Sequence, residues 1–160
     1  MHPPSPAPDP EARLAPERRA TLRVVVGMLV PASADGRMPG AADLPEVLRH
    51  VERVVAGLPA LCDGLDLLER EAIGRHGAAF AALDHAARSA LLGEFAARAP
   101  AVLQRIGLET VTCYYQQDGV VEGLGLEARP PFPIGFQVIA GDLTLLNPVI
   151  ARGRIYRDAS

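Results

Sequence analysis

Apolar residues along the chain recur mostly at helical spacing. In residues 16–30, four of them lie at i, i+3, i+4 and i+7, which places them on one side of an α-helix. These residues are Leu22, Val25, Val26 and Leu29. Pro16 suits the first turn of this helix, and Pro31 stops it. The pattern therefore predicts an amphipathic helix over residues 16–30.

Four more segments between residues 43 and 114 show the same spacing. The ranges are 43–58, 59–76, 84–98 and 100–114. Their expected inward positions are Leu44, Val47, Leu48, Val51, Val55, Leu58, Leu61, Leu65, Leu68, Ala72, Ala87, Leu91, Leu92, Phe95, Leu103, Ile106, Thr110, Val111 and Tyr114. Asp43 and Glu46 have the spacing of a capping box, and Asp84 suits an N-cap. Asp118 is expected to cap a short helix that bears Val120, Val121 and Leu124.

The two ends of the chain differ from this helical centre. Residues 1–15 carry five prolines and few large apolar side chains, which predicts a disordered Pro-rich leader. After residue 126 the helical period stops, and three closely spaced prolines favour extended geometry. We therefore expect an all-α fold, a compact bundle of about five to six helices over residues 16–126. Residues 127–160 would form an extended, mostly irregular arm that packs on this domain or on a partner.

Composition narrows the class of protein further. A chain of 160 residues suits one domain, and its abundant Ala and Leu favour helix packing. The net charge of −3, with acids and bases interspersed, argues against a nucleic-acid-binding domain. No apolar run reaches the roughly 20 residues of a membrane span.

Residues 18–34 allow a second interpretation. Paired arginines, a short apolar run and an Ala-x-Ala-like ending resemble a twin-arginine export signal. Arg23 interrupts the run, however, and the same residues make a good amphipathic helix. We expect a core helix and a cytoplasmic protein. The alternative is a periplasmic location, if residues 18–34 act as an export signal.

The chain offers few candidates for catalysis or metal binding. Cys62 and Cys113 lie far apart outside any CxxC spacing, and are expected to be small buried hydrophobes. The histidines lack HExxH spacing, and the glycines form no nucleotide-binding loop. The acids at positions 63, 66 and 69 are expected to form an ordinary solvated helix face. We therefore assign no catalytic, cofactor-binding or metal-binding residues.

Four stretches resemble, in their order, the gluconate 2-dehydrogenase subunit 3 family. They read "TLRVVVGMLVPA", "DGRMPGAADLPEVLRHVE", "FAALDHAARSALL" and "ETVTCYYQQD", and the resemblance covers roughly residues 17–126. Its members are small helical accessory subunits of flavin dehydrogenases. The resemblance implies a noncatalytic accessory subunit that binds or stabilises a large flavin-dependent dehydrogenase subunit and holds no cofactor itself. The tail after residue 124 looks like a C-terminal extension found in a subset of such proteins.

Two other functions stay open from the residues alone. The chain could be a self-contained helical protein, perhaps a homodimer, or a small enzyme that uses a thiol or a histidine–carboxylate pair. For the accessory subunit, the aromatic and Pro-rich stretch around residues 114–138 is the expected partner-binding region, since large rigid aromatic side chains suit interfaces. The candidate residues are Tyr114, Tyr115, Arg129, Pro131, Phe132 and Phe136.

Overall fold

The computed structural model describes residues 14–128 and 141–153. All regular structure in these two ranges is helical, and neither contains a strand, so the all-α prediction is confirmed. The chain divides into two units, Met1–Ala128 and Arg129–Ser160. Each unit is described by itself.

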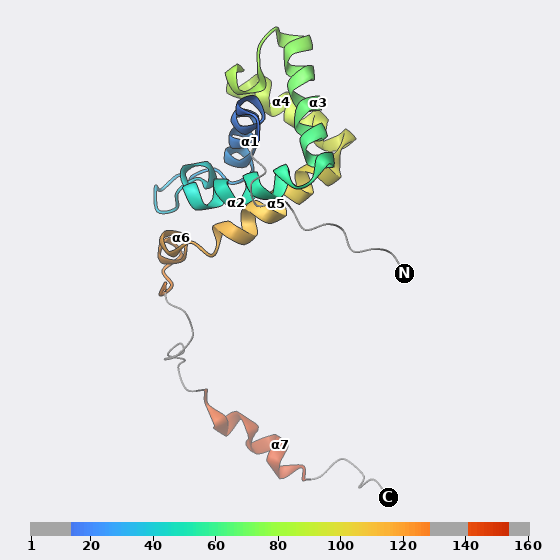
Figure 1. Ribbon diagram of the computed structural model, residues 1–160. Coiled ribbons are helices and arrows are strands. Elements are labelled where there is room, and N and C mark those ends of the chain that lie inside the picture. Colours follow the sequence, from blue (N-terminus) through green and yellow to red (C-terminus); the bar gives the residue numbers. More distant parts are fainter. Residues whose placement is uncertain (1–13, 129–140, 154–160) are drawn as a thin grey trace, which may run out of the picture. The chain divides into compact units, whose positions relative to one another are not determined.

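The first unit is a bundle of helices (Figure 1). In chain order its elements are α1 (Pro16–Leu29), the 3₁₀ turn η1 (Ala41–Asp43), α2 (Pro45–Ala56), α3 (Pro59–His76), the 3₁₀ turn η2 (Phe80–Ala82), α4 (His85–Arg98), α5 (Pro100–Tyr114) and α6 (Asp118–Gly123). A proline begins α1, α2, α3 and α5, where its fixed φ is already helical and its missing N–H costs no hydrogen bond. Gly77, at a φ of 68°, ends α3 in the left-handed conformation that glycine adopts without strain.

Of the three capping predictions, two are wrong and one is confirmed. Asp118 does not cap α6: it is the first residue of that helix, Gln117 is the N-cap, and no side chain makes a capping hydrogen bond. Asp43 lies in η1 rather than at the start of α2, so it forms no capping box with Glu46. The cause is Pro45, because a proline forces the preceding Leu44 into an extended conformation and the helix begins after it. Asp84 does cap α4, and its carboxylate accepts a hydrogen bond of 2.8 Å from the Ala87 N–H.

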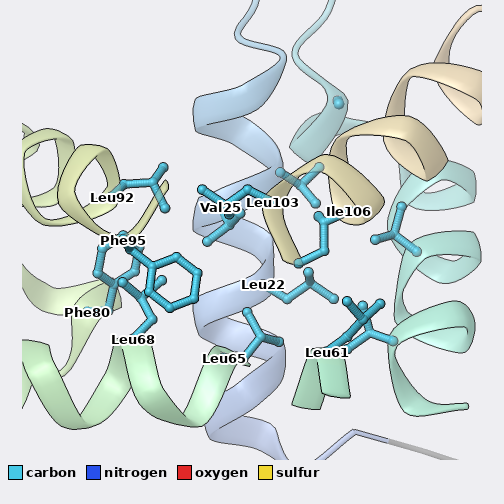
Figure 2. Close-up of a cluster of buried hydrophobic side chains, with 14 of the residues drawn as sticks. Leu22, Val25, Leu61, Leu65, Leu68, Phe80, Leu92, Phe95, Leu103 and Ile106 are labelled. Carbon is cyan, nitrogen blue, oxygen red and sulfur yellow. The ribbon is translucent and has the colours of Figure 1, made fainter. Parts of the chain in front are cut away.

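The core forms where α1 packs against α2, α3 and α5. Figure 2 shows its side chains pointing toward one another from these helices and from α4 and η2. The labelled residues are Leu22, Val25, Leu61, Leu65, Leu68, Phe80, Leu92, Phe95, Leu103 and Ile106. Most expected inward positions are buried, but Leu58, Val111 and Leu124 are exposed. These three stand at the edges of their apolar stripes, where helical spacing alone does not decide the side.

Polar contacts tie α1 to α3 beside this core. Arg18 donates two hydrogen bonds of 2.6 Å to the Asp66 carboxylate, and the Thr21 hydroxyl donates one of 2.8 Å to Glu69. The same Glu69 oxygen accepts the backbone N–H of Phe80 at 3.2 Å. The expectation of an ordinary solvated acidic face is therefore wrong for Asp66 and Glu69, because α1 and η2 cover that side of α3. Asp63 is exposed as expected.

The Arg18–Asp66 pair predicts part of the acid sensitivity of the fold. Hydrogen bonds from Arg18 hold the pKa of the Asp66 carboxyl below its ordinary value of 3.8. A carboxyl with a lowered folded pKa stabilises the fold above its unfolded pKa, and this contribution is lost as pH falls through the folded value. Asp66→Asn should therefore reduce the fall in unfolding free energy between about pH 6 and about pH 2, measured by urea unfolding.

The size of this pH effect is limited, because about a third of each side chain remains exposed to solvent. Asp63→Asn, at an exposed position of the same helix, is the matched control. Its unfolding free energy should depend on pH as that of the wild type does. An Asp66→Asn slope equal to that of the wild type would contradict a stabilising role for the pair.

The crossing of α3 and α5 depends on a glycine. A Cβ added at Gly64 would lie 2.7 Å from Cγ1 and 2.8 Å from Cγ2 of Val102. Valine is stiff about χ1, so it has little room to move away. Gly64→Ala should lower the free energy of unfolding by about 1–2 kcal/mol, because overpacking outweighs the gain in helix propensity. Thermal or urea unfolding measures this change.

Gly74 provides the matched control in the same helix. A Cβ added there meets no heavy atom within 4 Å, so Gly74→Ala should raise the free energy of unfolding by about 0.5 kcal/mol. Adding Val102→Ala to the Gly64→Ala variant should restore part of its loss. Equal stabilisation by both glycine substitutions would show that α3 and α5 are not in close contact at Gly64.

The described part of the second unit, residues 141–153, is one short helical segment. It consists of the 3₁₀ turn η3 (Leu143–Leu146) followed directly by α7 (Asn147–Ala151). From the sequence we expect a mostly irregular arm here, so these short helical turns add to it; Gly153, whose φ is 69°, follows the end of α7. Asp142 makes the extra turn possible, because its carboxylate accepts the Thr144 N–H at 3.0 Å. Within the two described ranges, no helix is both long and apolar enough to cross a membrane.

Candidate interaction surface

Helix α5 carries apolar side chains on two sides. Its inner side contributes Leu103, Ile106, Thr110 and Tyr114 to the core. Its outer side carries Leu108, Val111 and Tyr115, which are 60%, 41% and 51% exposed. These three residues stand at i, i+3 and i+7, so they form one continuous stripe along the helix, here called the outer stripe. The bundle buries only the inner side of α5, so the apolar side chains of the outer stripe remain exposed to solvent.

The two adjacent tyrosines have different roles. Tyr114 is 1% exposed, and its hydroxyl donates a hydrogen bond of 2.8 Å to the Pro39 carbonyl. Burial away from water raises the pKa of this hydroxyl. The Tyr115 ring stands edge-on to the Tyr114 ring, at a centroid distance of 5.3 Å and an angle of 83°. Tyr114 therefore anchors the end of α5 in the core, while Tyr115 is held against it and points outward.

The charges beside the outer stripe are paired with one another. Glu109 lies 2.8 Å from the Arg105 guanidinium and 2.9 Å from His50 Nε2 of the neighbouring helix α2. These contacts keep the Glu109 carboxylate on the flank of α5, where it is mostly covered. The middle of the outer side, from Leu108 to Tyr115, carries no other charged side chain. Its composition is that of the uncharged centre of a protein interface.

Helix α6 continues the apolar surface in sequence. Val120 is buried, whereas Leu124 and Leu126 are 47% and 62% exposed. The backbone of Gly123 comes so close to the loop before α2 that an added Cβ would lie 2.7 Å from the Arg37 carbonyl oxygen. This close approach fixes the end of α6 against the loop that carries Arg37.

The structure describes only part of the predicted partner-binding region. Of its six candidate residues, Tyr114 is in the core and Tyr115 is on the surface. Arg129, Pro131, Phe132 and Phe136 lie outside the described residues. Leu108 was not among the candidates, although its spacing from Tyr115 could have identified it: it is a large apolar residue off the inner stripe.

The two cysteines do not have the properties of catalytic thiols. Both are free and half-buried rather than fully buried, and burial raises the pKa of each thiol, which disfavours the nucleophilic thiolate. The Cys62 thiol donates to the Val55 carbonyl at 3.3 Å. In the part of the chain that the structure describes, no group of three or more His, Cys, Asp or Glu side chains is placed to hold a metal ion.

The short segment of the second unit is also apolar on its surface. Taken by itself, it exposes five large apolar side chains: Leu143, Leu145, Leu146, Val149 and Ile150. Exposed apolar surface of this kind is normally covered by another structure. Such a segment has the composition of a docking element.

Comparison with known protein families matches residues 16–123 to the family described as gluconate 2-dehydrogenase subunit 3. The matched range begins with α1 and ends with α6, so it spans every helix of the first unit. No curated protein matches the chain, and no solved structure does.

Proposed function

The chain belongs to the gluconate 2-dehydrogenase subunit 3 family, and from this we propose that it is a noncatalytic accessory subunit. It binds and stabilises a larger oxidoreductase subunit, a flavin-dependent dehydrogenase, which carries the cofactor and the reaction. The family description supports the broader statement that the chain is related to a subunit of a dehydrogenase. The identity of the partner and the noncatalytic role are our proposal.

The outer stripe of α5 carries this proposal. Leu108, Val111 and Tyr115 present exposed apolar surface at the end of a helix whose inner side is fixed in the core. Tyr115 loses little conformational freedom on binding, because Tyr114 already supports its ring. Interfaces concentrate their binding free energy in such rigid aromatic side chains.

We propose that the stretch after α6 extends this interface. Arg129, Pro131, Phe132 and Phe136 follow Leu126 closely in sequence, and they add aromatic, Pro-rich and cationic groups. Together with the apolar segment 143–150, they would give the partner a long and mostly uncharged contact surface. The helical domain, residues 16–126, then serves as the folded base, and residues 127–160 serve as the arm.

Co-purification from the native host tests the function directly. The tagged full-length chain should capture one large flavoprotein in a fixed ratio, recognised by its flavin absorbance and by mass spectrometry. Light scattering of the purified chain measures its molar mass, and this tests the alternative that the chain is a homodimer. A stable homodimer that captures no oxidoreductase would contradict the proposal.

We further propose that the protein keeps α1 and is not cleaved within residues 18–34. The paired arginines of this segment are both engaged within the fold, Arg18 with Asp66 and Arg19 with Glu52 at 3.2 Å. Leu22, Val25 and Val26 of the same segment are fully buried. Removing this helix would expose the core, which favours a cytoplasmic location over export. Mass spectrometry of the mature N-terminus tests this, and a start after residue 34 would contradict it.

A further inference from the structure

A pocket away from the outer stripe lies between α1 and the beginning of α4. Its volume is about 550 Å³, within the range of about 300–1,000 Å³ that is typical of small-molecule sites. One wall is the side of α1 that bears Arg23, Val24 and Met28, and the other is the first turn of α4 with His85 and Arg88. The contacts assigned above to the core and to the outer stripe do not use this pocket.

The charged side chains that line the pocket are all basic. Arg23 is exposed, and among the described residues its side chain makes no hydrogen bond or ion pair. Arg88 is held in place, because its Nε donates to the Phe80 carbonyl at 3.3 Å and its Nη2 donates to the Ala81 carbonyl at 2.6 Å. The pocket lining thus contains one fixed guanidinium and one free one, the planar donor groups that bind an anionic oxygen pair.

The neighbouring acids do not neutralise this arrangement. Asp43 and Asp84 adjoin lining residues in sequence, but neither lines the pocket. The Asp84 carboxylate accepts the Ala87 N–H as the cap of α4. A chain with a net charge of −3 thus has a concave site whose lining carries only positive charge.

The remainder of the lining is mostly apolar. Val24 and Met28 of α1 and Pro31 of the following loop provide side-chain surface next to the basic groups. Gly27 of the same helix also lines the pocket, and its backbone packs closely on Ala42, since an added Cβ would lie 3.2 Å from the Ala42 Cβ. A ligand that contacts both the basic and the apolar parts of the lining must carry an anionic head and an apolar portion.

We propose that this pocket binds a small amphiphilic anion, with a carboxylate or phosphate head and a short apolar chain. The head pairs with Arg23 and with the free edge of the Arg88 guanidinium. The chain lies against Val24, Met28 and Pro31, where burial of its methylene groups adds to the affinity. The site is independent of the proposed partner surface, so either can exist without the other.

Calorimetric titration of the full-length chain tests the site with four probes. Octanoate and octyl phosphate carry both features, acetate carries only the charge, and octanol carries only the chain. We expect saturable binding of octanoate or octyl phosphate, and binding at least about tenfold weaker for acetate and octanol, because each lacks one half of the contacts. The head group that the site prefers, carboxylate or phosphate, is that of the anion with the higher affinity.

Arginine variants localise the binding. Arg23→Gln should weaken binding of the preferred anion about tenfold, because it removes a charge-assisted hydrogen bond. It should leave the fold intact, since Arg23 is exposed. Arg53→Gln, at an exposed position of α2 outside the pocket, is the matched control and should bind like the wild type. Octanol binding as tightly as octanoate, or unchanged binding by Arg23→Gln, would overturn the proposal.

Discussion

Leu108→Glu is expected to abolish capture of the proposed oxidoreductase partner while leaving the fold unchanged. Leu108 is the first residue of the outer stripe and is 60% exposed, so a carboxylate there is solvated in the free protein. In the complex the same carboxylate would be buried against apolar surface without a partner, which is costly. We expect the dissociation constant to rise by a factor of about 100 or more. Co-purification and titration against the captured flavoprotein measure the change.

Ile73→Glu is the matched control for this substitution. Ile73 is 53% exposed on α3 and lies outside the outer stripe, so the same change of chemistry should leave partner capture at the wild-type level. Tyr115→Ala should weaken binding by a factor of about 10–100, whereas Tyr115→Phe should retain most of it, because the ring supplies the contact area. Undiminished capture by both Leu108→Glu and Tyr115→Ala would exclude the outer stripe as the binding surface.

The second large effect is expected at Glu69, within the fold. Its carboxylate accepts the Thr21 hydroxyl from α1 and the Phe80 N–H from η2, so one side chain joins three elements. Phe80 is fully buried, and Glu69→Ala would leave its N–H without an acceptor. The Thr21 hydroxyl would keep only its 3.2 Å bond to the Glu17 carbonyl. We expect the free energy of unfolding to fall by about 3 kcal/mol, measured by urea unfolding.

Two controls separate hydrogen bonding from charge at Glu69. Glu69→Gln keeps an oxygen acceptor and should lose only about 1 kcal/mol. Glu94→Ala removes an exposed carboxylate whose ion pair with Arg75 lies on the surface, and it should leave stability nearly unchanged. A loss for Glu69→Ala no larger than for Glu94→Ala would mean that Glu69 does not hold these elements together.

The helices of this protein could be predicted from local pattern. Each proline that begins a helix carries its own conformational restriction, and each inner stripe repeats at helical spacing. The predicted starts at Pro16, Pro59 and Pro100 agree with the structure for that reason. The start of α2 was misplaced, because the local signal of Asp43 competed with that of Pro45 and the steric restriction of proline prevailed.

The candidate site could be predicted only in part. The sequence drew attention to the tyrosine pair, and the inner stripe placed Tyr114 toward the core, where the structure finds it. It did not show that the Tyr114 hydroxyl has its acceptor in the loop at Pro39, or that Tyr115 stays on the surface. Both features depend on contacts between distant parts of the chain.

By itself, the sequence determined the helical class, most helix boundaries and the inner stripes, because these depend on residues within a few positions of one another. Only the tertiary structure decided that Asp66 and Glu69 face α1 instead of solvent. It alone placed Arg23 and Arg88 around one pocket and left Leu108 and Tyr115 uncovered. Such features depend on which helices pack together, and residues distant in the chain carry no local pattern that records this.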